Sequence, residues 1–424
     1  MSREMPYASS PIAPPAAPTP TVATEPSPAP ARGLALWIVC ISHGLNHLQG
    51  NMTNLLYPLM MAELGFGYFQ IGLLTTAFTL TTNGLQAIYG LLTPYMRRSV
   101  LLGLGNSLMA LATAATGLVH SYWQLFVTRI ISGIGSSPQH PVGSTLLIGL
   151  FPHARGRALA LHTTGGNVGT LAAPLIVGAL VAFLDWRTVF LLVALPSLAV
   201  GLAYLLVRDQ LPLTVGRRPS SQASWQAYLA CLRNRNLLII SLVQMVGAAG
   251  RGQGIDIAFL TPHFVNDFQL DLPTATLLIT ILQAGGLFGP LALGWLSDRT
   301  SRKPVLLASL ALSALATYGL AVIGAPGPLL LANLLVYGIV VNSRLVLTQA
   351  LIADSAGREA ADAAFSLYFF VGFISAPLWT LIFGWLMEHY GFTIGFMAMG
   401  ATYVVAMGLI AFIRTPQSGA AARA

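Results

Sequence analysis

The stretch Gly294-Trp-Leu-Ser-Asp298-Arg-Thr-Ser-Arg302-Lys303 stands between two long apolar runs and has a related copy earlier in the chain. That copy, Gly90-Leu-Leu-Thr-Pro-Tyr-Met-Arg97-Arg98, begins 204 residues before it. Two further landmarks recur at a distance of 203 residues: Ala172-Ala-Pro174 with Ser375-Ala-Pro377, and Arg155 with Arg358. Three landmarks at almost the same period predict a duplicated six-helix unit, a plan known from membrane transporters.

The composition indicates that most of the surface faces lipid. Of the 424 residues, 55% are hydrophobic and 8% are charged, and the mean hydropathy is +0.71. A soluble domain carries about 25% charged residues, which cover its surface. The bilayer is therefore the expected environment of this chain.

Twelve apolar runs are long enough to cross a membrane, which takes about 20 mainly apolar residues. The expected fold class is an all-α polytopic membrane protein of twelve transmembrane helices, with two pseudo-symmetric six-helix bundles at 34–207 and 236–413. A cytoplasmic linker is expected at 208–235, a disordered Pro- and Ala-rich cytoplasmic tail at 1–33, and a second tail at 414–424. The expected spans are 34–61, 69–92, 100–119, 122–149, 157–183, 188–207, 237–262, 274–296, 304–324, 328–352, 361–387 and 392–413.

The basic residues set the orientation. With the N-terminus inside, 17 of the 21 Lys and Arg residues fall in cytoplasmic segments and one, Arg187, falls in an outside loop. Positively charged loops stay on the cytoplasmic side, so both termini are expected there. The abundant Ala, Gly and Arg with a single Lys favour a GC-rich bacterial genome, and hence the inner membrane of a cell. A monomer is expected.

Several classes of function are excluded. The net charge of +8 is scattered over short gaps rather than gathered on one basic face, which argues against nucleic-acid binding. We find no arrangement of nucleophile, base and acid, no phosphate-binding loop and no dinucleotide motif, so no enzyme activity and no cofactor are expected. Cys40 and Cys231 are not expected to form a disulfide. Without an ATP-binding domain, an ion gradient or the substrate's own gradient must drive transport.

The three remaining arginines, Arg129, Arg251 and Arg344, fall inside expected spans, where ionisable side chains are costly and mark functional sites. Guanidinium groups bind carboxylate or phosphate through two hydrogen bonds, so this excess of cations favours an anionic substrate. The alternative is structural, with each arginine bonding neighbouring helices and never meeting substrate.

Asp256 is the one carboxylate placed well inside the bilayer. Burial raises the pKa of a carboxyl group and a nearby arginine lowers it, so the pair of Asp256 and Arg251 could be poised to take up and release a proton. Alternatively they form a buried pair that only neutralises two charges. Five positions apart on a helix, they point about 140° away from each other.

The first span is unusually polar and is therefore expected to face a central cavity. His43 and His47 are four positions apart and share one face of it, beside Asn46. Histidine titrates near neutral pH, so these two are candidates for proton coupling, or else they simply line a wet cavity. A metal site is not expected, because the sequence shows no third ligand. His140 and Asn167, in later spans, are candidates for substrate contact or for structural roles.

Asp298, Arg299 and Arg302 follow the eighth span at its cytoplasmic end. A carboxylate there can bond a helix terminus and basic loop groups in one state of the protein only. We therefore expect a gate that stabilises the outward-facing state. The alternative is a solvated turn.

The chain resembles the major facilitator superfamily. Residues 294–303 are similar to its loop signature, and Arg129-Ile-Ile-Ser-Gly133-Ile-Gly135 is similar to its fourth-helix pattern. Ser42-His43-Gly-Leu-Asn46-His47 and Gly133-Ile-Gly-Ser-Ser-Pro-Gln-His140-Pro141 resemble fosmidomycin-resistance-type exporters, although His47 stands where those have an acid.

That resemblance implies alternating access and export of a small, often anionic molecule by proton antiport. The arginine excess alone fits proton-coupled uptake of an organic acid equally well. The alternative of another class is a membrane receptor that binds ligand without transport.

Overall fold

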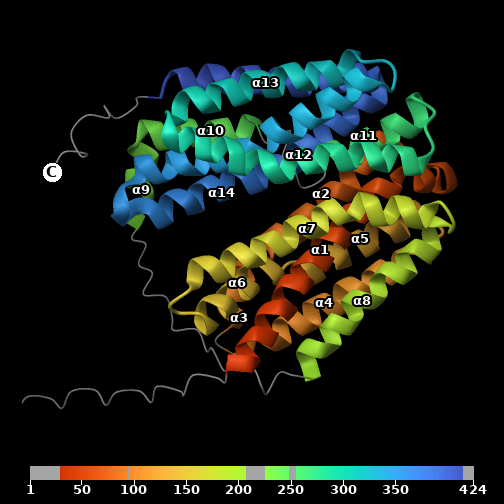
Figure 1. Ribbon diagram of the computed structural model, residues 1–424, viewed down its shortest axis with the longest axis horizontal. Helices are drawn as coiled ribbons and strands as arrows, with labels where there is room; N and C mark the ends of the chain where they lie inside the picture. The colour runs from red at the N-terminus through yellow and green to blue at the C-terminus, as the bar shows by residue number, and fades with distance from the viewer. Residues whose placement is uncertain (1–28, 94, 207–224, 248–254, 414–424) are drawn as a thin grey trace, which may run out of the picture.

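The computed structural model describes residues 29–93, 95–206, 225–247 and 255–413 (Figure 1). Every regular element among them is helical, which confirms the all-α prediction. The first half contains α1 (Ala29–Leu64), α2 (Tyr68–Gly84), α3 (Gln86–Leu92), α4 (Arg98–Thr116), α5 (Tyr122–Ser136), α6 (Gln139–Leu150), α7 (Arg155–Val181) and α8 (Trp186–Leu206). The second contains α9 (Trp225–Arg233), α10 (Arg235–Val246), α11 (Ile255–Pro262), the π-helix η2 (His263–Asp267), α12 (Leu272–Arg299), α13 (Arg302–Val322) and α14 (Pro328–Ala411).

The helices do not correspond one to one with the twelve expected spans. The span expected at 122–149 is divided between α5 and α6 around Pro138, a residue that cannot donate the backbone hydrogen bond of a continuing helix. The last three expected spans fall in α14 apart from the final two residues. Its 84 residues include Gly391 at φ +82, a left-handed conformation that no α-helix continues through. Seven helical segments of the described chain are long and apolar enough to cross a membrane.

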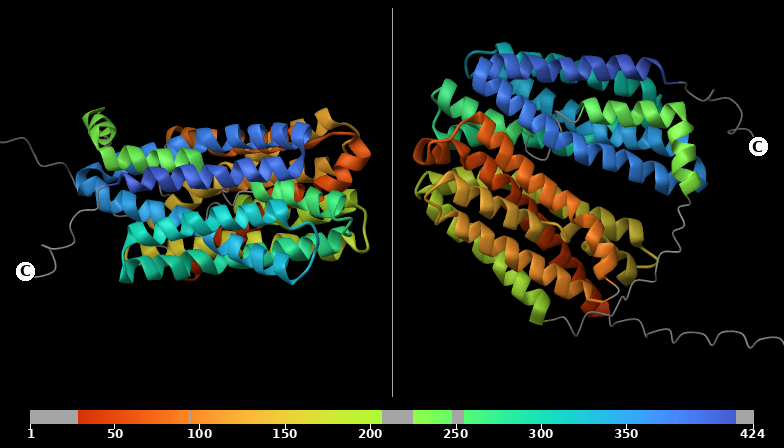
Figure 2. Two further views of the ribbon diagram at one scale, coloured as in Figure 1. Left: turned by 90° about the horizontal axis from the view of Figure 1, so that it is seen from above. Right: turned by 180° about the vertical axis from the view of Figure 1, so that it is seen from behind.

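Two groups of helices lie side by side, α1–α8 in one and α9–α14 in the other (Figures 1 and 2). They converge toward one end, where Thr76 Oγ1 of α2 donates to the carbonyl oxygen of Pro377 in α14 at 3.1 Å. At the same end the backbone N–H of Tyr68 donates to Glu388 Oε2 at 2.6 Å. Toward the other end the ribbons of the two groups diverge.

Large apolar side chains are exposed in both groups, as is expected of a chain surrounded by lipid. Phe183 is 88% exposed and Leu291 is 71% exposed. In the interior, small residues allow close helix contact: a Cβ on Gly165 of α7 would lie 2.5 Å from the carbonyl oxygen of Cys40 in α1. Such small-residue contacts are typical of helix pairs in membranes, and this one places α7 directly against the polar part of α1.

Candidate functional site

Polar side chains along α1 bond to helices on several sides. Ser42 donates to Gln139 Oε1 of α6 at 3.1 Å, and Gln49 Nε2 donates to the carbonyl oxygen of Val193 in α8 at 3.2 Å. Asn46, a predicted substrate contact, is buried and accepts a hydrogen bond from Ser136 of α5 at 2.9 Å. Much of the polarity of this span is therefore used within the first bundle, which the sequence alone could not show.

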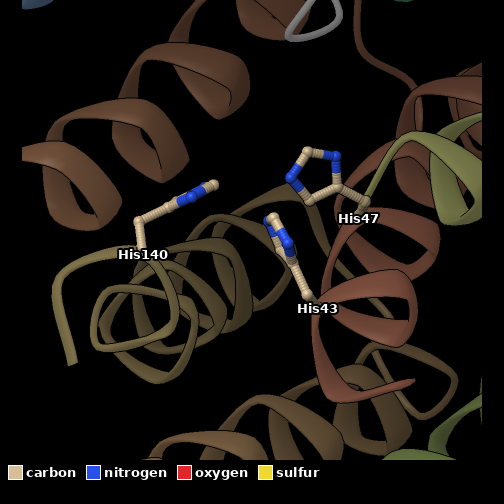
Figure 3. A group of neighbouring side chains, drawn as sticks. All are labelled: His43, His47 and His140. Atoms are coloured by element: carbon tan, nitrogen blue, oxygen red, sulfur yellow. The ribbon is translucent and has the colours of Figure 1, made fainter. Parts of the chain in front are cut away.

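Three predicted residues, His43, His47 and His140, meet between α1 and α6 (Figure 3). The ring centroids of His43 and His47 are 4.6 Å apart, and those of His43 and His140 are 4.7 Å apart. A fourth ring, that of His162 in α7, lies 4.1 Å from His43. His43 and His162 are 4% and 2% exposed. The structure thus gathers four imidazoles, where the sequence suggested a pair.

Arg129 of α5 is 2% exposed and bonds within the first bundle. Its Nη1 donates to Thr53 Oγ1 of α1 at 3.0 Å, and its Cζ lies 4.1 Å from the ring centroid of Phe78 in α2, a cation–π contact. Its Nε has no hydrogen-bond partner among the described residues. This geometry fits the structural interpretation and leaves the Nε donor for a ligand.

Arg344 of α14 belongs to a buried network of the second bundle. Its Nη1 donates to Gln244 Oε1 of α10 at 2.8 Å, and the same oxygen accepts from the Tyr368 hydroxyl at 3.0 Å. That hydroxyl lies 2.5 Å from Thr348 Oγ1. The Nε of Arg344 is buried and has no partner in the described part of the chain, so the network holds the guanidinium in place without using all of its donors.

Asp256 of α11 is 1% exposed, as predicted for a buried carboxylate. Its Oδ1 accepts the backbone N–H of Ile257 at 2.9 Å, while Oδ2 is buried without a partner among the described residues. Tyr337 and Tyr403 lie close enough to interact with the charges of both Asp256 and Arg344. The two ionisable side chains thus belong to one polar region of the second bundle.

Two other predicted substrate contacts do not join these clusters. Arg251 lies outside the described residues, so the expected relation between Arg251 and Asp256 stays a prediction. Asn167 of α7 is exposed.

The predicted gate residues bond within the second bundle. Arg302 Nη1 donates to Asp298 Oδ1 at 3.0 Å, and Arg302 Nε lies 2.5 Å from Asp354 Oδ2 of α14. The guanidinium of Arg299 stacks on Trp295 at 4.2 Å. In this arrangement the segment ties α12 and α13 to α14.

Sequence reasoning missed two contacts of charged side chains at the end where the bundles converge. Glu388 accepts the backbone N–H groups of Tyr68 and Phe69, at 2.6 and 3.4 Å, from the first turn of α2. Arg187 Nη2 donates to Glu63 Oε1 at 2.7 Å, which joins the start of α8 to the end of α1. Neither pair is recognisable from sequence spacing, because the partners lie 320 and 124 positions apart.

Comparison with known proteins identifies one family, and the relatives described below are named for transport or drug resistance. The sequence model described as Major Facilitator Superfamily matches residues 39–266 and 252–423. The "Probable L-galactonate transporter" of Escherichia coli (strain K12) is 25% identical over 283 residues, 62% of this chain and 61% of that protein. The match thus spans about three fifths of that relative's length. The "Fosmidomycin resistance protein" of the same strain is 29% identical over 149 residues, 35% of this chain and 36% of that protein.

Solved structures share the fold. A bacterial homolog of the human lysosomal transporter Spinster, in an inward-facing and occupied conformation, matches with a TM-score of 0.76 at 17% identity, covering 90% of this chain and 97% of that one. The nucleoside transporter NupG matches with a TM-score of 0.74, also at 17% identity, covering 89% and 98%. At such identity the likeness concerns the fold alone.

Proposed function

This chain belongs to the major facilitator superfamily and is a multi-pass membrane transporter, and on that premise we propose that it exports a small organic anion in exchange for protons. The carrying observation is the charge of the described interior. This interior contains two buried cations, Arg129 and Arg344, and one buried carboxylate, Asp256. One arginine comes from each bundle, and in the proposed site an anion between the bundles contacts both of them.

Anion recognition is supported by the donors that these arginines leave unused. Arg129 Nε and Arg344 Nε are buried without hydrogen-bond partners in the described part of the chain. An unpaired buried donor is costly, and a carboxylate or phosphate would satisfy it with a charge-assisted hydrogen bond. Gln244 and Thr53 hold the two guanidinium groups in place for that contact.

Proton coupling is proposed at Asp256. One oxygen of this carboxyl group is bonded to the backbone and the other is unpaired, so adding a proton there breaks no hydrogen bond observed in this state. Removing a carboxylate from water disfavours its charged form, so a buried carboxylate takes up a proton more readily than an exposed one. Because Tyr337 and Tyr403 lie near both Asp256 and Arg344, the two ionisable groups share one polar region, and protonation of Asp256 would alter the electric field at the proposed anion site.

Alternating access is supported by the uneven contact between the bundles. Hydrogen bonds from Tyr68 and Thr76 join the bundles at one end, and the ribbons diverge at the other (Figures 1 and 2). We assign the diverging end to the cytoplasm, because the basic loops and both termini are expected on the cytoplasmic side, and the joined end to the outside. The described state is then inward-facing, in the inner membrane, and a monomer suffices.

Three relatives bear on the direction of transport. The match to a fosmidomycin resistance protein favours export, whereas the L-galactonate and sialic acid transporters have names that specify organic acids and fit the second candidate, proton-coupled uptake. Both candidates use the same anion site and differ in whether substrate and protons move in opposite or equal directions.

The test is proton flux in proteoliposomes of the full chain, read with an internal pH dye against a panel of organic anions, phosphonates and cationic drugs. Anion-dependent flux is expected, with substrate moving against the proton flow. Asp256→Asn should abolish proton-driven accumulation and spare substrate exchange. The matched control is Asp271→Asn, the same change at an exposed helix cap where Asn caps equally well.

Each outcome tests one part of the proposal. Movement of substrate and protons in the same direction would replace export by uptake. Unchanged accumulation in Asp256→Asn would remove Asp256 from the mechanism, and response to cations alone would remove the anion site. Ligand binding to folded protein without flux would favour a receptor.

A further inference from the structure

The geometry points to a site for a divalent transition-metal ion, made by His43, His47 and His140. Each of these three side chains offers one ring nitrogen, and the three nitrogen atoms lie within 4.8 Å of one another. Figure 3 shows the rings turned toward one space, two from α1 and one from α6. This inference does not rest on the proposed transport function.

Hydrogen bonds to α7 hold both histidines of α1 in the tautomer that carries its hydrogen on Nδ1 and leaves Nε2 free to bind a metal ion. His43 Nδ1 lies 2.7 Å from the carbonyl oxygen of His162, and since a carbonyl only accepts, Nδ1 must carry the hydrogen. The lone pair of neutral His43 is therefore on Nε2, which is buried and has no partner among the described residues. A metal-binding imidazole is usually oriented in this way, by a backbone carbonyl at its other nitrogen.

His47 is oriented through a relay. Thr170 Oγ1 donates its only hydrogen to the carbonyl oxygen of Gly166 at 3.2 Å. The same hydroxyl oxygen lies 2.8 Å from His47 Nδ1 and so accepts from it. The second lone pair of the cluster is then also on Nε2, and both α1 ligands are supported by α7.

The distances between the three nitrogen atoms suit a metal-free site in which the rings move slightly closer together when an ion binds. An ion bonded to nitrogen at about 2.1 Å in tetrahedral geometry requires nitrogen atoms about 3.4 Å apart. His47 and His140 are only partly buried, so their side chains can turn, and the same exposure gives an ion a route in. Imidazole ligands suit Zn²⁺, Ni²⁺, Co²⁺ and Cu²⁺ rather than Mg²⁺ or Ca²⁺.

Three neutral ligands leave one coordination position open. His162 Nε2 is a candidate for it, being buried and without a partner in the described chain, with its ring beside His43. Because the ligands come from α1 and α6, a bound ion would also cross-link two helices of the first bundle.

The test uses the full chain, purified in detergent with a tag that contains no histidine, and titrated with Zn²⁺, Ni²⁺ or Co²⁺ in a calorimeter. We expect one ion per chain, a visible Co²⁺ absorption band of tetrahedral type, and a higher Tm with metal. His43→Ala, His47→Ala and His140→Ala should each weaken binding at least tenfold. His153→Ala, at an exposed position after α6, should bind as the wild type does.

A gentler variant covers the case in which an alanine variant does not fold. Thr170→Val keeps the volume of the side chain and removes the acceptor of His47, so it should weaken binding about 10- to 100-fold, as loss of a supporting hydrogen bond does. The proposal is overturned if the wild type binds no ion. It is equally overturned if folded His47→Ala and Thr170→Val both bind with wild-type affinity.

Discussion

Gly166 of α7 lies directly against the imidazole of His43 of α1. A Cβ at position 166 would come within 2.7 Å of Cε1 and 2.9 Å of Nε2 of that ring. The His43 ring is also bonded to the carbonyl oxygen of His162, one turn earlier in α7, so it has little room to move aside. The histidine cluster thus depends on the lack of a side chain one helix away.

Gly166→Ala should therefore destabilise the protein, although alanine favours a helix over glycine. Overpacking typically costs about 1–3 kcal/mol, more than the about 1 kcal/mol of helix propensity it would gain. The matched control is Gly156→Ala in the first turn of the same helix, where a Cβ meets nothing within 4 Å. Thermal unfolding should show a lower Tm for the first variant and an equal or higher Tm for the second. Equal changes in Tm for the two variants would mean that the His43 side chain can move aside without cost.

Substitution of Arg344 should separate charge from geometry in anion transport. Arg344→Gln removes the cation, and loss of a charge-assisted hydrogen bond of about 1.5–3 kcal/mol corresponds to roughly a 10- to 150-fold rise in KM. Arg344→Lys keeps the charge but not the planar fork that Gln244 orients, so it should recover only part of the affinity. Substrate-concentration series in proteoliposomes measure both.

The control for that pair is Arg235→Gln, which removes an exposed arginine at the start of α10. It should leave KM unchanged. If Arg344→Gln behaves in the same way, Arg344 serves only to join α10 and α14.

Glu388→Gln should weaken the closed end of the molecule. The carboxylate of Glu388 receives two N–H groups at the N-terminus of α2, where a negative charge contributes about 0.3–2 kcal/mol. Its loss should shift the ratio of the two end states roughly two- to thirtyfold toward opening at this end. Spin labels at Ser121 and His389, one on each bundle, would report a larger population at long distance.

Asp185→Asn serves as the control for Glu388→Gln, because its hydrogen bonds to Arg187 and Thr188 stay within the start of α8. The label distances should not change in that variant. An unchanged distance distribution in Glu388→Gln as well would show that apolar contacts alone close this end.

Arg187→Ala should lower the Tm in a pH-dependent way. Hydrogen bonds from Arg187 and then Trp186 hold the pKa of Glu63, just beyond the expected first span, below its usual value. A lowered pKa means that the pair stabilises the fold at neutral pH, and that this contribution fades as the pH falls through the folded pKa. The Tm difference between wild type and variant, roughly 1–3 °C for an exposed pair, should therefore shrink in acid. A difference that is constant with pH would assign the effect to the other contacts of Arg187, which are its hydrogen bonds to the carbonyl oxygens of Gly117 and Val119 and its stacking on Trp186.

The sequence by itself determined the class of this protein and much of its chemistry. Hydropathy is a local property, so runs of apolar residues were enough to predict an all-α membrane protein, and the repeat at Gly90 and Gly294 indicated the duplication. The cost of a charge in a bilayer was enough to single out Arg129, Asp256 and Arg344, all of which are buried.

Only the tertiary structure decided which of these residues meet. Helical periodicity puts His43 and His47 on one face, but it does not say which helix covers that face, so the approach of His140 and His162 could not be read from spacing. The same holds for Glu388 and Tyr68, whose contact depends on how two bundles pack. Side-chain contacts between helices arise from packing of whole surfaces, and that information is distributed over the chain rather than written in any one segment.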